Sequence, residues 1–350
     1  MHTIILKGYN KYMKLYFGRA AVVAFAFLIA SLSLFACTDV PESTEEELTS
    51  VLTVGDVEVP FEVYRYFFMN YKNEYDSGDD SYWKNDDVNA SAICEVIKEK
   101  TLSAIHRCYA TFALCEEYGI DPYSTEMDKI VNETVDYYIK NEFGSKKEYV
   151  ASLESVYMTD SVFRFIMRRF ECDKALNDAL IASGTIKTDD ETVLLAIKDP
   201  DVFCRAKQIL IKNDVGEDIS ANLAKAKDAL NAVSLGTDFD RLVAQYGEDT
   251  EMIINPTGYY FTHNELIEEF EEAAFALKIG ETSGIVESHV GYHIIQRLDV
   301  DASYVKENFE ALKESYLTWK YQEAIESEMD KLTVTETNET LLSSLTDFAK

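Results

Sequence analysis

Basic residues are scarce in this 350-residue sequence: 33 lysines and arginines stand against 63 aspartates and glutamates, a formal net charge of -30. The first 36 residues hold four of those basic residues and no acidic one, so the rest of the chain is more acidic still. An anionic surface repels phosphate backbones and anionic lipid heads. The shortage therefore argues against nucleic acid as a partner and against a polybasic membrane patch. Solubility is the simplest use of the acidity, and a specific basic partner is the alternative.

The six cysteines lack the spacings that mark a metal site or a disulfide framework, because there is no CxxC and no histidine at ligand spacing. Cys108 and Cys115 are separated by about two turns of a predicted helix, which is too far for a bridge between them. Buried free thiols are expected at Cys94, Cys108, Cys115, Cys172 and Cys204. The sequence predicts no metal site.

No apolar run is long enough for a comfortable bilayer span. The run from Ala20 to Phe35 follows basic residues and suits the hydrophobic region of an export signal. It ends in Leu34-Phe35-Ala36-Cys37, which resembles a bacterial lipobox. The resemblance implies a signal peptide over 1–36 and a lipid anchor on Cys37, at the extracytoplasmic face of the cell membrane. Met13 is an alternative start, and an uncleaved signal anchor is the alternative interpretation.

Residues 37–50 are rich in acidic and small polar residues and predict a flexible acidic tether. Alternating apolar and polar residues around Gly55-Asp56 then predict a hairpin over 52–60. The next segments show helical periodicity, and residues 76–87 are predicted to form a loop. Helices are predicted over 61–71, from 93 to a stop at Gly119 and Pro122, and over 124–142, 146–156 and 159–183.

Strand and helix patterns alternate from residue 203 to residue 298. The first predicted strand, 203–212, places Ala206, Gln208 and Leu210 on one face. Two helices follow, the second capped by Asp238, and Asn264 is expected to cap a later helix that runs to Leu277. The remaining strands are predicted over 257–261, 283–287 and 292–298.

Two motifs in this segment resemble the signature of the parvulin-type peptidyl-prolyl isomerases. They are Glu268-Glu269-Phe270-Glu271-Glu272-Ala273-Ala274-Phe275-Ala276-Leu277 and Gly291-Tyr292-His293-Ile294-Ile295. The predicted order of strands and helices is also that of a parvulin domain. The resemblance implies a parvulin domain over 201–299, with a small antiparallel-containing sheet surrounded by helices.

The preceding hairpin and helices resemble the SurA- and PrsA-like exported foldases, in which a parvulin domain interrupts a helical chaperone domain. That resemblance implies an α+β fold, with a mainly helical chaperone domain over 51–200. A helix predicted over 304–332, followed by a strand-like segment, fits the returning C-terminal piece of such proteins. The implied division therefore ends with 303–350 as a C-terminal helix returning to the chaperone domain, plus a tail.

The parvulin resemblance also implies the site. Asp249 and Ser288 match polar positions of the family, His293 matches the second of its two buried histidines, and Gln208 stands where the first histidine normally lies. These four are the expected catalytic residues. Substrate is expected to contact an apolar set, together with a threonine that replaces an apolar residue of the family: Leu266, Phe270, Phe261 and Thr257. Glutamine can donate and accept hydrogen bonds but cannot titrate.

Rotation about a peptide bond meets a barrier of about 18–20 kcal/mol, and no nucleophile is needed to lower it. No cofactor is therefore expected. The implied function is that of an exported, membrane-anchored foldase, which isomerises X-Pro bonds and chaperones unfolded or newly exported polypeptides. Because Gln208 replaces a histidine, the alternative is a non-catalytic holdase whose parvulin domain only binds clients. A purely structural lipoprotein is a third alternative, and the oligomeric state stays open.

Overall fold

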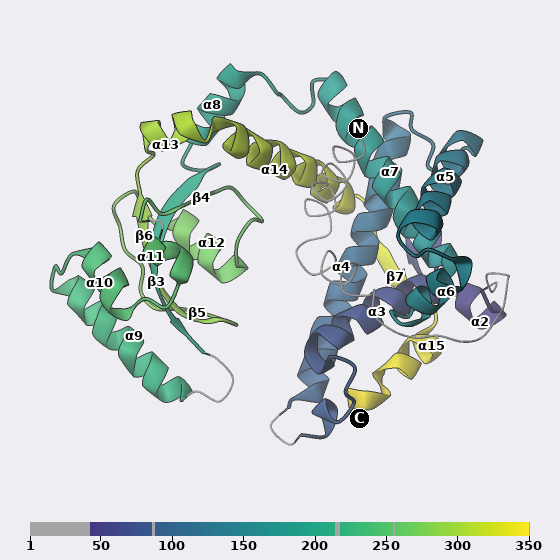
Figure 1. Ribbon diagram of the computed structural model, residues 1–350, viewed down its shortest axis with the longest axis horizontal. Helices are drawn as coiled ribbons and strands as arrows, with labels where there is room; N and C mark the ends of the chain where they lie inside the picture. The colour runs from purple at the N-terminus through teal and green to yellow at the C-terminus, as the bar shows by residue number, and fades with distance from the viewer. Residues whose placement is uncertain (1–42, 86–87, 214–217, 255, 350) are drawn as a thin grey trace. The chain divides into compact units, whose positions relative to one another are not determined.

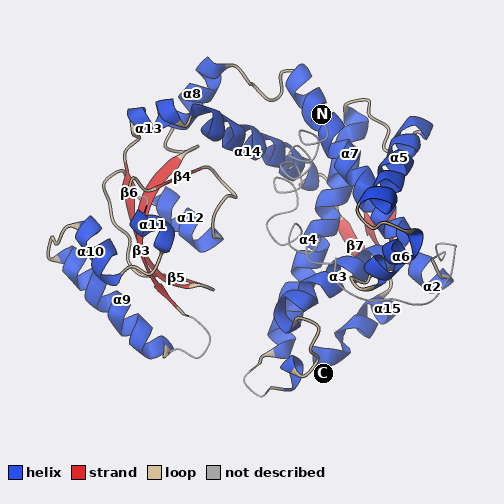
Figure 2. Ribbon diagram, viewed as in Figure 1, coloured by secondary structure: helices blue, strands red, loops and turns tan. Residues whose placement is uncertain are grey.

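The structure is a computed structural model that describes residues 43–85, 88–213, 218–254 and 256–349. The predicted signal peptide and Cys37 lie outside the described residues. The described residues divide into two compact units, the first lying within 1–183 and 323–350 and the second within 184–322. The fold is α+β, as predicted, with mostly helices and small antiparallel sheets (Figure 2).

The first unit is built from long helices around a small sheet (Figure 1). Its elements are α2 (Glu45–Leu48), β1 (Ser50–Val54), β2 (Val57–Pro60), α3 (Phe61–Asp76), η1 (Tyr82–Lys84), α4 (Ala90–Glu117), α5 (Thr125–Asn141), α6 (Lys146–Glu154), α7 (Asp160–Ala182), β7 (Val334–Glu336), α15 (Glu339–Ser343) and η2 (Ser344–Ala349). The hairpin and the helices predicted from the periodicity are confirmed. The predicted loop over 76–87 contains one turn of 3-10 helix, in which the Trp83 side chain is buried.

The hairpin forms because Gly55 adopts a left-handed conformation, φ +57°, between β1 and β2. On its other edge β1 pairs antiparallel with β7, so Leu52 lies opposite Glu336. Part of the predicted tether is also placed on this unit. A capping box formed by Thr44 and Glu47 starts α2, and the Ser43 hydroxyl donates to the carboxylate of buried Glu62 at 2.6 Å.

The second unit holds a four-stranded antiparallel sheet in the order β4-β3-β6-β5. Its elements are α8 (Asp190–Lys198), β3 (Cys204–Lys212), α9 (Ile219–Ser234), α10 (Phe239–Tyr246), α11 (Thr250–Ile254), β4 (Tyr259–Phe261), α12 (Glu268–Ala276), β5 (Val286–Ser288), β6 (Gly291–Leu298), α13 (Ala302–Glu307) and the first part of α14 (Phe309–Met329). The strands predicted from alternation are confirmed, although β4 and β5 are shorter than predicted. Asp238 caps α10 as predicted, accepting from the backbone N–H of Arg241.

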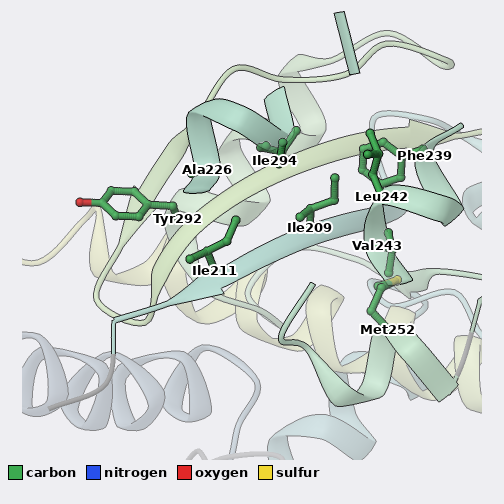
Figure 3. Packing of buried hydrophobic residues seen from close by; sticks show 10 residues of the cluster. Ile209, Ile211, Ala226, Phe239, Leu242, Val243, Met252, Tyr292 and Ile294 are labelled. Atoms are coloured by element: carbon green, nitrogen blue, oxygen red, sulfur yellow. The ribbon is translucent and has the colours of Figure 1, made fainter. Parts of the chain in front are cut away.

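Both faces of this sheet are covered, and each carries a separate apolar cluster. Ile209 and Ile211 of β3 and Ile294 of β6 pack against α9 and α10 (Figure 3). The alternate positions of the same strands, with Ala206 and Ile295, pack against α12. Since successive side chains of a strand point to opposite faces, the polar residues Gln208 and His293 lie on the face that α12 covers.

The start of α12 corrects the prediction that Asn264 caps this helix. The helix begins at Glu268 after Ile267, which provides no side-chain cap, and Asn264 is in a left-handed conformation with φ +65°. The carboxylate of Glu271 instead reaches back to accept from the backbone N–H groups of Asn264, Glu265 and Leu266, at 2.8, 2.7 and 2.5 Å. A carboxylate in the first helical turn thereby satisfies the loop before the helix.

The single helix predicted over 304–332 is in fact two, since Asn308 separates α13 from α14. The Asn308 side-chain amide donates to the carbonyl of Tyr304 at 2.9 Å, competing with the regular helical pattern. The strand after it begins at Val334 rather than Leu332. The boundary between the two compact units falls within α14.

Within the described residues, the cysteines are buried free thiols, as expected. No helix of this described part is long and apolar enough to cross a membrane. The same residues contain no group of three or more histidine, cysteine or acidic side chains placed to hold a metal ion.

We expect Gly258→Ala to destabilise the second unit more than Gly280→Ala. Both glycines have nearly the same left-handed conformation, φ +88° and +87°. A Cβ on Gly258 would lie 2.8 Å from the carbonyl oxygen of Ala206, whereas one on Gly280 would meet nothing within 4 Å. The steric clash should cost at least about 1 kcal/mol beyond the shared backbone strain. Urea denaturation of both variants measures this difference, and equal losses would contradict it.

Candidate active site

The pairing of β3 with β6 brings Gln208 and His293 together. Leu210 lies opposite His293 in this ladder, so Gln208 is its diagonal neighbour on the same face. The Gln208 Oε1 atom lies 2.7 Å from His293 Nδ1. Both side chains are shielded from solvent, with exposed fractions of 7% and 1%. The buried polar atoms therefore satisfy each other across the strands.

The other end of the Gln208 amide meets Asp249. Gln208 Nε2 donates to Asp249 Oδ2 at 2.7 Å, and the Tyr259 hydroxyl donates to the same oxygen at 2.6 Å. The second carboxylate oxygen, Oδ1, accepts from the backbone N–H groups of Glu251 and Met252, at 3.1 and 3.4 Å. Asp249 is thus both the cap of α11 and a member of the site.

Ser288, the last residue of β5, completes the series. Its Oγ lies 2.6 Å from His293 Nε2 and also accepts from the backbone N–H of Val290 at 3.3 Å. Hydrogen bonds therefore connect five side chains without interruption, and we call this set the polar chain: Ser288, His293, Gln208, Asp249 and Tyr259.

Aromatic rings flank the polar chain at His293. The Phe270 ring, from α12, lies 5.8 Å from the His293 ring, with an interplanar angle of 63°. The ring of Phe261, in β4, lies 5.8 Å from the Phe270 ring. Both phenylalanines are buried, whereas the side chain of Leu266, in the loop before α12, is 39% exposed. The loop that carries Leu266 is the one held by the Glu271 carboxylate.

Burial decides the protonation of the two titratable rings. Loss of hydration lowers the pKa of His293 to about 4, although Glu269 and Asp249 act in the opposite direction. Burial, and then the hydrogen bond to the Asp249 carboxylate, raise the pKa of Tyr259 above its usual value. At neutral pH the site therefore contains a neutral imidazole and a neutral phenol.

The structure brings together the four residues predicted to be catalytic and places the predicted Phe270 and Phe261 beside them. Thr257 lies just before β4, and its carbonyl oxygen accepts from Arg205 Nε at 2.7 Å. Tyr259 was missed by the sequence prediction. A signal for it existed, because Tyr259 alternates with Phe261 and therefore shares the face of that residue in β4.

Comparison with known proteins gives matches in this region and beyond it. Residues 208–299 match the family model described as "Rotamase: PPIC-type PPIASE domain". The foldase protein PrsA of Caldanaerobacter subterraneus subsp. tengcongensis is 26% identical over 90% of this chain and 94% of its own length. The PrsA of Geobacillus kaustophilus is 33% identical, over 31% of this chain and 35% of its length. A crystal structure of the peptidylprolyl isomerase PrsA from Bacillus anthracis is 21% identical, covering 65% of this chain and 96% of its own, with a TM-score of 0.35.

We expect the second unit to lose stability as the pH falls from about 6.5 to 4. The unfolded chain binds a proton on His293 in this window, while the folded chain, with a pKa of about 4, does not. The neutral His293 contributes on the order of 3 kcal/mol to the free energy of unfolding. This contribution is fully present above pH 6.5 and is lost as the pH falls to 4. In urea denaturation between pH 4 and pH 7, the free energy of unfolding should depend less on pH in His293→Gln than in the wild type. Exposed His289 offers the control, and His289→Gln should keep the dependence of the wild type; identical curves for all three proteins would contradict the assignment.

Proposed function

We propose that this chain, which contains a parvulin-type domain and is related to the PrsA foldases, catalyses cis-trans isomerisation of X-Pro bonds in unfolded polypeptides. The single observation that carries the proposal is the unbroken polar chain beside the buried Phe270. A series of fixed polar groups beside a buried aromatic ring can favour the twisted peptide bond over the planar one.

The chemistry explains that requirement. Rotation removes the conjugation of the amide, so a site accelerates it by favouring the twisted state over the planar one. Apolar groups that hold the proline ring and remove water from the carbonyl oppose the planar state, and fixed polar groups stabilise the twisted one. We assign the apolar role to Phe270, Phe261 and Leu266, and we propose Thr257 as a further residue in contact with the substrate. We assign the polar role to His293 and Ser288, at one end of the polar chain.

The substitution at position 208 does not interrupt this arrangement. The NH2 group of Gln208 donates to Asp249 and its oxygen accepts from His293, so both ends of the amide have a hydrogen-bond partner. Proton transfer is not part of amide rotation, so loss of a titratable group at this position is compatible with catalysis. The rival function, a holdase whose domain only binds clients, is favoured by the same substitution if the family histidine is needed for more than hydrogen bonding.

We further propose the domain division and location indicated by the sequence. The chaperone domain would comprise 51–200 together with the returning segment within 303–350, the parvulin domain 201–299, and the export signal 1–36. Cys37 would carry the lipid that anchors the protein outside the cytoplasmic membrane, and the part of 37–50 that precedes α2 would be the tether. Newly exported polypeptides with X-Pro bonds would be the clients. The motif Leu34-Phe35-Ala36-Cys37 after an apolar run supports this location.

The purified protein should accelerate cis-to-trans exchange of a proline-containing tetrapeptide. We expect His293→Ala and Phe270→Ala to reduce kcat/KM at least about tenfold, because each removes a group beside the reacting bond. The matched control is Leu235→Ala, since Leu235 is 79% exposed after α9 and lies outside the polar chain. Acceleration no greater than that of buffer would contradict the proposed reaction.

The same assay distinguishes the foldase from the holdase. Gln208→His should raise the turnover if the histidine improves an intact site. Suppression of the aggregation of an unfolded client, measured by light scattering, without isomerase activity in either the wild type or Gln208→His, would support the holdase. Loss of both activities would overturn both functions.

Expression in a bacterium that processes lipoproteins tests the proposed location. Wild-type protein should enter the membrane fraction and incorporate a labelled fatty acid, while Cys37→Ser should do neither. Cys94→Ser is a suitable control for the loss of a cysteine elsewhere in the chain. Equal labelling of the wild type and Cys37→Ser would contradict the lipid anchor.

A further inference from the structure

The Asp249 carboxylate is fully occupied. A carboxylate offers about four acceptor directions, and Asp249 accepts from four donors, two on each oxygen. Two of these donors are backbone N–H groups at the start of α11, which can only donate. The other two, Gln208 and Tyr259, belong to side chains that can also accept. No acceptor direction is left for a client.

This occupation sets the direction of every hydrogen bond in the polar chain. Because a carboxylate only accepts, the Gln208 amide must direct its NH2 group to Asp249 and its oxygen to His293. His293 must then carry its proton on Nδ1, which leaves Nε2 as an acceptor. The Ser288 hydroxyl must therefore donate to Nε2, 2.6 Å away.

We propose that Asp249 is a positioning residue, held by α11 and Tyr259, that acts through Gln208 to fix His293 as the Nδ1–H tautomer and Ser288 as the donor to His293. The inference deepens the proposed function, because it assigns roles within the same site. It makes Asp249, one of the four expected catalytic residues, a residue that acts through Gln208 and not through contact with the client.

The direction of the Ser288 hydrogen bond also restricts which client groups this side chain can contact. The Ser288 proton is used on His293, so its oxygen faces the client with lone pairs only, one of them directed to the Val290 N–H. A client group that contacts Ser288 must then be a donor, such as a backbone N–H, rather than the carbonyl oxygen of the X-Pro bond.

Asp249→Asn tests this assignment, because it should reverse the direction of each hydrogen bond in the polar chain from position 249 to Ser288. The backbone N–H groups of Glu251 and Met252 can only donate, so the new amide oxygen should keep the capping position and the NH2 group should face Gln208. The Gln208 amide must then rotate by half a turn and present its NH2 to His293. The His293 proton should move from Nδ1 to Nε2, and Ser288 should become the acceptor.

The tautomer can be measured directly. Long-range proton–nitrogen NMR spectra of the full chain at pH 7, labelled with 15N at its five histidines, distinguish the two imidazole tautomers. Comparison with His293→Gln assigns the signal. We expect the Nδ1–H form in the wild type and the Nε2–H form in Asp249→Asn.

Two further variants separate the ends of the chain. Tyr259→Phe removes the hydroxyl that donates to Asp249 Oδ2. Ser288→Ala removes the hydroxyl that donates to His293 Nε2, at the opposite end of the polar chain. Both should keep the Nδ1–H form, because the direction is set by Asp249. A switch in Ser288→Ala, or Nδ1–H in Asp249→Asn, would overturn the inference. The Nε2–H form in the wild type would do so as well.

The readout is independent of turnover. A wild type without isomerase activity that still shows this tautomer pattern would defeat the proposed reaction and leave the inference standing. An active wild type with the opposite tautomer would do the reverse. If Asp249→Asn loses its fold by circular dichroism, Ser288→Ala and Tyr259→Phe still decide between the two ends of the chain.

Discussion

The antiparallel pairing of β3 with β6 is the interaction on which the second unit depends. Its register runs from Arg205 opposite Leu298 to Lys212 opposite Gly291 and is long enough to fix which residues share a face. A shift of β3 by one residue relative to β6 would turn Gln208 to the opposite face of the sheet from His293, toward the cluster formed with α9 and α10. The register is fixed in part by backbone contact at Gly291, where a Cβ would lie 2.1 Å from the carbonyl oxygen of Ile211. Apolar packing on both faces then holds the strands in place.

Much of this arrangement could be predicted from the sequence, because it follows from local rules. Alternation in 203–212 placed Gln208 with Ala206, and the spacing of apolar residues located the helices that cover the sheet. The cap at Asp238 was predictable from residue type, whereas the start of α12 was not. There the Glu271 side chain forms contacts with a loop five to seven residues earlier, and no local pattern distinguishes that carboxylate from the exposed acids around it.

The site shows the same division. Its residues could be found through a resemblance, but their connections required the tertiary structure. Whether Asp249 caps a helix or joins the site could not be decided from Tyr246-Gly247-Glu248-Asp249 alone, since both roles need only a short acidic side chain. The structure gives one carboxylate oxygen to each role. Tyr259 was overlooked because a tyrosine in a short strand is usually explained by packing, and its hydroxyl partner lies in a separate loop ten residues earlier.

Polar satisfaction also explains which residues position 208 can accept. The side chain there must donate to a carboxylate and accept from an imidazole, 2.7 Å away on each side. An aliphatic residue would leave the Nδ1 atom of the buried His293 unpaired, at about 1–3 kcal/mol, and would remove one of the four donors of Asp249. Glutamine and histidine both carry a donor and an acceptor, so they can serve the same geometry, although only histidine titrates. A reaction that transfers protons would distinguish between them strongly. Rotation about an amide moves no proton, so the constraint that matters at this position is direction and distance, and the amide meets both.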